Sequence, residues 1–180
     1  MSESHAPQLP RIGTLATLGA ELAHLAWEAA HGGVKAHHIL NRDTLPEISN
    51  WWGLILLPLL AWFLLGRIAR RIPTTGSRRL PAQVMVGLIG ALLYGLGLTV
   101  AFSTGASEIA SLMASGILFL ALLLPVYRAE CVLGLVLGMT FTFGVVLPTA
   151  FASILAGISA VVQLVIVPAV LRLVHRIARK

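Results

Sequence analysis

The chain has 180 residues, of which 57% are hydrophobic and only 11% are charged, and its mean hydropathy is +0.89. Soluble domains carry roughly 25% charged residues, so this composition excludes a soluble globular protein and predicts an integral membrane protein. The formal net charge is +6, and the single Cys131 excludes an internal disulfide framework.

An amphipathic helix is predicted first, at residues 12–31, inside a polar N-terminal extension that covers residues 1–47. On a helical wheel its leucines form one stripe, its alanines and glycines a second face, and its Glu and His side chains a third. The helix can lie along the membrane interface or cross the bilayer as a sixth span. We favour the interfacial helix, with its Glu and His stripe facing solvent or headgroups, because four ionisable groups are costly inside a span.

Two Glu-x-x-His pairs stand out on this helix, Glu21 with His24 and Glu28 with His31. In di-iron carboxylate bundles a Glu and a His at this spacing bind the same metal, and imidazole with carboxylate suits Zn or Fe. Both pairs lie on one helix about two turns apart, so they do not converge on one ion by themselves. A metal site here would need a second copy of the helix or further ligands from His37, His38, Asp43 or Glu47. The alternative is a polar helix face that binds no metal.

A transmembrane helical domain is expected at residues 48–180, which makes the fold class an all-α polytopic membrane protein. Crossing about 30 Å of hydrocarbon takes about 20 apolar residues, and the backbone must then be helical. Ser49 or Asn50 can cap the first of these helices, and Trp51 and Trp52 suit an interfacial aromatic belt. We expect five firm spans, at residues 51–66, 84–103, 108–127, 131–149 and 153–173.

Basic residues occur in every second predicted loop and at the end of the chain. They are Arg67, Arg70, Arg71, Arg78, Arg79, Arg128, Arg172, Arg176, Arg179 and Lys180. The positive-inside rule therefore predicts a bacterial inner-membrane protein whose C-terminus is cytoplasmic. The same residues suit anionic headgroups of the cytoplasmic leaflet, so the lipid bilayer is the expected partner and nucleic acid is not.

Glycine spacing predicts close helix packing in the later spans. Gly134 and Gly138 form a G-x-x-x-G pair, which lets two helix backbones approach each other. Residues 84–128 and 131–172 also share a loose order of Gly, Pro and Arg. This similarity favours a parallel hairpin repeat, an arrangement that occurs in transporters.

Few polar residues are predicted in the later spans. They either line a narrow pathway or form hydrogen bonds that pack the helices. No acidic or His side chain is expected near the midplane, and no Ser, His and Asp constellation is present, so we expect no catalytic residue there. The candidate pathway or packing residues are Glu108, Ser111, Ser115, Thr140 and Gln163.

Three classes of function follow from this pattern. The favoured one is an oligomeric permeation or transport unit for a small solute or ion, because a few short helices enclose little pathway unless copies assemble. The second is an accessory or scaffold subunit that packs against a membrane protein partner. The third is a metal-dependent membrane enzyme that uses the Glu and His stripe of helix 12–31, although the sequence as a whole favours a protein that is not an enzyme.

Overall fold

A computed structural model describes residues 8–34, 36–38, 47–72 and 80–179, and within these ranges the fold is all-α. Three helical segments are long and apolar enough to cross a membrane, namely Asn50–Ala69, Ala82–Ser103 and Val146–Ala178, which indicates a membrane protein. The helices are α1 (Gln8–Ala30), α2 (Gly53–Ala69), α3 (Ala82–Ser103), α4 (Ser107–Leu123), α5 (Ala129–Phe143), α6 (Val146–Val161) and α7 (Val167–Ala178).

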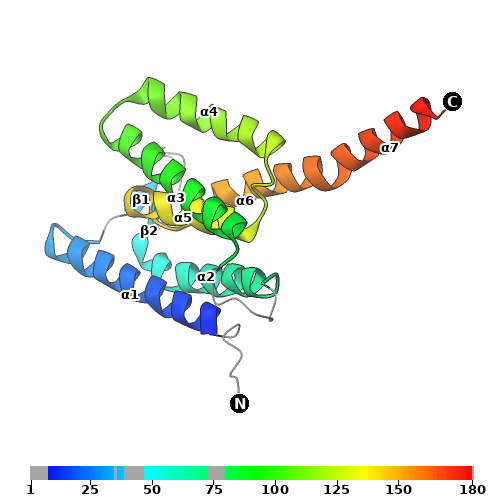
Figure 1. Ribbon diagram of the computed structural model, residues 1–180. Helices are drawn as coiled ribbons and strands as arrows, with labels where there is room; N and C mark the ends of the chain where they lie inside the picture. The colour runs from blue at the N-terminus through cyan, green and yellow to red at the C-terminus, as the bar shows by residue number, and fades with distance from the viewer. Residues whose placement is uncertain (1–7, 35, 39–46, 73–79, 180) are drawn as a thin grey trace, which may run out of the picture.

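Helices α1 and α2 form an antiparallel pair and lie side by side (Figure 1). Leu9, at the start of α1, packs against the buried cluster that contains Ile68 near the end of α2. At the other end of the pair, the side chain of Glu28 meets Asn50, just before α2. The two helices therefore cover the same length of the bundle.

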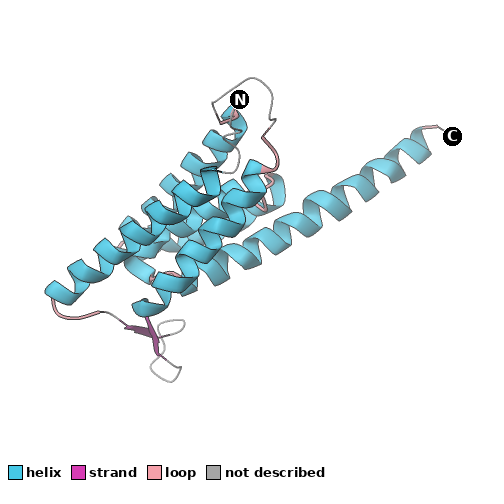
Figure 2. Cartoon of the chain, turned by 90° about the horizontal axis from the view of Figure 1, so that it is seen from below, coloured by secondary structure: helices cyan, strands magenta, loops and turns pink. Residues whose placement is uncertain are grey.

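A short antiparallel pair of strands precedes α2. Strands β1 (Ala36–His38) and β2 (Glu47–Ser49) pair with Ala36 opposite Ser49, and Figure 2 shows them at one end of the helices. A 3₁₀ turn at Asn50–Trp52 follows, and the backbone N–H of Trp51 donates to the Ser49 hydroxyl at 3.4 Å. The predicted cap at Ser49 is confirmed.

Helices α3 and α5 make the most extensive contact of any helix pair described. Glycines on α5 allow the two backbones to approach closely. A methyl group at Gly134 would overlap the carbonyl oxygen of Leu88, and one at Gly138 would overlap that of Leu92. The Thr99 hydroxyl donates to the carbonyl oxygen of Gly138 at 3.1 Å across the same contact. The predicted G-x-x-x-G packing is confirmed.

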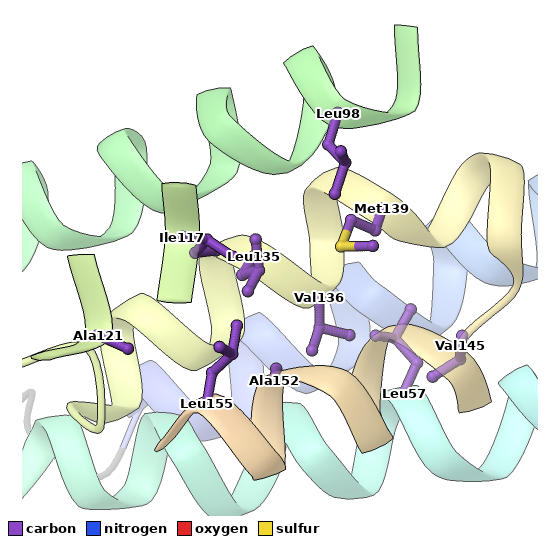
Figure 3. Close-up of a cluster of buried hydrophobic side chains, with 10 residues drawn as sticks. All are labelled: Leu57, Leu98, Ile117, Ala121, Leu135, Val136, Met139, Val145, Ala152 and Leu155. Carbon is purple, nitrogen blue, oxygen red and sulfur yellow. The ribbon is translucent and has the colours of Figure 1, made fainter. Parts of the chain in front are cut away.

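Helix α5 lies at the centre of the bundle, in contact with α2, α3 and α6. Its Val136 is fully buried in the main apolar cluster, to which five helices contribute (Figure 3). The buried members of this cluster are Leu57, Leu98, Ile117, Ala121, Leu135, Val136, Met139, Val145, Ala152 and Leu155.

Two predicted span boundaries differ from the structure. The expected span 108–127 ends earlier as a helix, at Leu123, because Leu124 precedes a proline and adopts an extended backbone. The expected span 131–149 is interrupted, because Gly144 has a φ of 68° and ends α5 at Phe143. The next helix therefore begins at Val146 and not at residue 153.

The predicted number of five spans is not confirmed. Helices α4 and α5 are apolar but have only 17 and 15 residues. Helix α6, in contrast, continues through a π-helical turn at Val162–Ile166 into α7, so that one helix of 33 residues runs to Ala178. Its C-terminal part projects away from the other helices (Figure 1). The π-helical turn ends two residues before Pro168, which has no N–H to donate.

Candidate functional site

The Glu and His face of α1 points into the protein. Glu21 and Glu28 are each only 3% exposed, whereas Leu15 is 68% and Leu22 is 51% exposed on the outer face. The expectation that this polar stripe faces solvent or headgroups is therefore wrong for Glu21, His24 and Glu28, whereas His31 is exposed. A helical wheel separates the faces of a helix, but it does not say which face meets other helices.

His24 lies between the two buried carboxylates. Its Nδ1 is 3.8 Å from Oε2 of Glu21, and its Nε2 is 3.6 Å from Oε1 of Glu28. The same Oε1 accepts a hydrogen bond of 2.9 Å from Nδ2 of Asn50. On its other side the imidazole lies against the ring of Phe141, with 5.0 Å between the ring centroids. We call Glu21, His24, Glu28 and Asn50 the polar cluster.

Helical spacing and one glycine create this geometry. Positions 21, 24 and 28 repeat at three and four residues, which brings their side chains to one face of α1. The carboxylate of Glu21 lies against Gly53 at the start of α2, where a methyl group would overlap it. Asn50 is itself buried, and it reaches the cluster from the turn that precedes α2. The site therefore depends on the α1–α2 pair.

His31 is not part of the polar cluster. Its ring stacks on Trp27 with 4.6 Å between the centroids, and its Nδ1 lies 2.8 Å from the Trp27 carbonyl oxygen. Of the four predicted metal ligands, the structure thus brings together Glu21, His24 and Glu28 only.

A metal site was one interpretation of the Glu-x-x-His pairs. Among the residues that the structure describes, no three His, Cys, Asp or Glu side chains are arranged to hold a metal ion. The backbones of His37 and His38 pair with Ile48 and Glu47 in the two strands, whereas Asp43 lies outside the described residues. Zinc or iron binding at Glu21, His24, Glu28 and His31 stays a prediction.

The inner face of α1 remains polar beyond the polar cluster. The Thr17 hydroxyl donates to the carbonyl oxygen of Thr14 at 2.9 Å. The hydroxyl oxygen of Thr14 is buried and has no hydrogen-bond partner among the described residues. Helical spacing places Thr14 and Thr17 on the same face of α1 as Glu21, His24 and Glu28, so this face stays polar over much of the helix.

The other candidate pathway residues do not converge. Glu108 is exposed in the first turn of α4, and the Ser115 hydroxyl donates to the carbonyl oxygen of Ser111 at 2.9 Å. The Thr140 hydroxyl likewise bonds to its own helix, at the carbonyl oxygen of Val136. Only Gln163 links two helices, by donating to the carbonyl oxygen of Leu122 at 2.8 Å.

One buried charge was missed by the sequence reasoning. Glu130 is 1% exposed at the start of α5, and Oε2 accepts a hydrogen bond of 2.5 Å from Nη2 of Arg71. The two residues are 59 positions apart, so only the folded chain brings them together. The available signal was an acidic residue at the start of a span, close to an arginine-rich loop.

The polar cluster supplies two carboxylates, an imidazole and an amide donor in a setting largely closed to solvent. Carboxylates and imidazoles enclosed by helices are the groups that proton relays and ion pathways use in membranes. No protein-family model matches this chain, and neither a curated protein nor a solved structure is detectably similar to it.

Proposed function

We propose that the protein is a membrane permeation or transport unit in which Glu21, His24 and Glu28 bind a proton or a small cation. The observation that carries this proposal is the distribution of side chains on α1: the carboxylates of Glu21 and Glu28 are buried, whereas Ile12, Leu15 and Leu22 are exposed. Water would favour the opposite distribution, whereas lipid favours this one. Ionisable groups held inside a membrane bundle are expensive, and by default they mark a functional site.

The pairing of α1 with α2 supports a transmembrane position for α1. Its 23 residues extend over about 35 Å, enough to cross about 30 Å of hydrocarbon. Exposed Trp27, Trp51 and Trp52 all lie near the Glu28–Asn50 end of the pair, as an aromatic belt would. Exposed Arg11 lies at the opposite end of α1. The proposed arrangement thus replaces the interfacial helix with a sixth crossing segment.

Six crossing segments would place both chain termini on the same side of the membrane. The arginines that follow α2, Arg128 before α5 and the basic end of α7 then share that side with Arg11. The positive-inside rule makes it the cytoplasmic side of a bacterial inner membrane, where anionic headgroups are the expected contacts. The polar cluster would lie toward the outer side of the bilayer.

Proton flux into liposomes tests the function. The purified protein is reconstituted with a pH-sensitive dye inside the vesicles, and a potassium diffusion potential drives uptake. We expect uptake above that of empty vesicles, at least tenfold slower uptake for Glu21→Gln with Glu28→Gln, and normal uptake for Glu108→Gln as the matched control. Sodium and magnesium indicators in the same vesicles test small cations. Wild-type flux no greater than that of empty vesicles for all of these ions would refute the proposal, as would full activity of the double variant.

Cysteine accessibility tests the position of α1 independently. In a Cys131→Ser background, single cysteines replace Ser2, Ala30 and Ala178, and intact cells are treated with a membrane-impermeant thiol reagent. We expect labelling at position 30 and protection at positions 2 and 178. Labelling at position 2 would mean that α1 does not cross the membrane, and it would remove the basis for a pathway along α1.

An accessory or scaffold subunit is a second candidate, and the C-terminal helix favours it. No residue of α7 is buried in the chain, and the helix projects from the bundle. Val170 and Val174 lie on one side of α7, whereas Arg172 and Arg176 lie on the other. An exposed amphipathic helix of this kind can pack against a membrane protein partner or a second copy of the chain. Co-purification of one defined partner that is lost on truncation after Ile166 would favour this candidate.

A further inference from the structure

A cavity of about 430 Å³ lies among α3, α4, α5 and α6, away from the polar cluster. Its walls are apolar, and Ile117, Leu135 and Leu155 contribute to them from three different helices (Figure 3). The volume falls in the range of about 300–1,000 Å³ that small-molecule sites occupy. A cavity with these walls suits a hydrocarbon group.

The polar residues of the cavity are concentrated at one end. Gln83 is in the first turn of α3, and Arg128 and Glu130 lie at the start of α5. Tyr94 lines the cavity about 16 Å further along α3, and its hydroxyl is already used, because it donates to the carbonyl oxygen of Met113 at 2.6 Å. One polar end and a long apolar body match an amphiphile with a single chain inside.

The charge at the polar end favours an anionic head. Glu130 is paired with Arg71, which neutralises its carboxylate. Arg128 is partly exposed and makes no ion pair with any residue in the described part of the chain. The uncompensated charge at this end of the cavity is therefore positive, and a guanidinium binds phosphate well.

Glycine leaves the space open on the α3 wall. A methyl group at Gly87 would press on the side chains of Glu130 and Cys131, so packing against α5 accounts for this glycine. A methyl group at Gly90 would meet nothing within 4 Å, so no neighbour within the chain requires a glycine there. Gly90 lines the cavity, and the room it leaves is available to a ligand.

We propose that this cavity binds one acyl chain of an anionic phospholipid, whose phosphate contacts Arg128. The lipid enters from the leaflet on the side of Arg71 and Arg128, the leaflet in which anionic headgroups are expected. This site is separate from the polar cluster, and it does not depend on the proposed transport function.

The reactivity of Cys131 can measure whether the cavity is occupied, because this residue lines the cavity wall and is the only cysteine in the sequence. The protein is placed in lipid nanodiscs of phosphatidylcholine, with or without phosphatidylglycerol, and the rate of Cys131 alkylation by N-ethylmaleimide is measured. We expect phosphatidylglycerol to slow alkylation at least threefold in the wild type. A general effect of surface charge on the thiol would slow every variant equally, so the ratio between the two lipid compositions is compared across variants.

Two variants should abolish the effect of phosphatidylglycerol, and one should keep it. Gly90→Leu fills the cavity, and Arg128→Gln removes the charge, so both should bring the ratio close to one. Gly157→Leu is the matched control, because a methyl group there also would meet nothing within 4 Å, and Gly157 does not line the cavity. Native mass spectrometry of the wild type and Arg128→Gln gives a second measurement, in which the wild type should retain more phosphatidylglycerol.

Three results would overturn the proposal. Equal slowing in all variants would mean an effect of surface charge alone. Equal retention of phosphatidylglycerol by the wild type and Arg128→Gln would remove the headgroup contact. Slowing by oleate added to phosphatidylcholine, with none by phosphatidylglycerol, would identify a free fatty acid as the ligand in place of a phospholipid.

Discussion

Replacing Gly134 with Ala should separate α3 from α5 and destabilise the protein. The added methyl group would overlap the carbonyl oxygen of Leu88 and lie 3.0 Å from the backbone N of Leu92. Both atoms belong to the backbone of α3, so they cannot move aside as the end of a side chain can. Overpacking of this kind costs up to about 3 kcal/mol. Alanine recovers about 1 kcal/mol through its higher helix propensity, which leaves a net loss of about 2 kcal/mol.

Gly157→Ala is the matched control for this experiment. The methyl group at position 157 would meet nothing within 4 Å, so the variant should be as stable as the wild type or slightly more stable. Reversible unfolding in mixed micelles of dodecyl maltoside and dodecyl sulfate, followed by circular dichroism, measures the difference in free energy. Gly138→Ala should behave like Gly134→Ala. The double variant should lose less than the sum of the two, because one separation of the helices relieves both overlaps.

Two results would refute the predicted overlap between α5 and the backbone of α3. If Gly134→Ala unfolds at the same detergent fraction as Gly157→Ala, the backbones of α3 and α5 do not approach as closely as the structure shows. Additive losses in the double variant would also contradict the reasoning, because they would mean two independent local strains instead of one shared interface.

Three further substitutions test the polar cluster and the buried ion pair. Gly53→Ala places a methyl group against the flexible end of the Glu21 side chain. It should slow proton or cation flux at least fivefold and lower the free energy of unfolding by less than about 1 kcal/mol. A larger loss of stability, or unchanged flux, would contradict this expectation. Asn50→Leu removes the hydrogen bond to a buried carboxylate and should cost about 1.5–3 kcal/mol in the detergent unfolding assay, where an unchanged midpoint would argue against that bond. Arg71→Gln leaves the carboxylate of Glu130 buried without its cationic partner. Breaking a fully buried ion pair lowers the free energy of unfolding by roughly 3–5 kcal/mol, and the loss here should be smaller because Arg71 is half-exposed. Adding Glu130→Leu should then restore most of the lost stability, and a further loss would mean that the carboxylate has another structural role.

Several features of the fold follow from local sequence alone. Apolar length predicted the helix at residues 84–103, and the structure has it at Ala82–Ser103. Glycine spacing predicted the close contact through Gly134 and Gly138, because a missing side chain permits backbone approach wherever the helix packs. The cap at Ser49 was also predicted, since a hydroxyl before a helical turn satisfies a free N–H locally.

Other boundaries depend on backbone geometry that a hydropathy window does not register. The apolar run from Cys131 to Thr149 is continuous in composition, but the positive φ of Gly144 ends α5 and starts a new helix. Whether a glycine continues a helix or ends it depends on the packing of the segments on either side.

The residues of the polar cluster could be partly predicted from the sequence, but their burial could not. Periodicity placed Glu21, His24, Glu28 and His31 on one face of a helix, and the structure brings the first three together but stacks His31 on Trp27. The sequence did not reveal that this face is buried, because burying a carboxylate depends on partners that only folding supplies, here Asn50 and the space at Gly53. The sequence did not reveal the pairing of Arg71 with Glu130 for the same reason, because it joins the turn after α2 to the start of α5, far away in the chain. Sequence by itself determined which groups share a helix face, whereas tertiary structure decided which face is inside, since desolvation is a property of the assembled bundle.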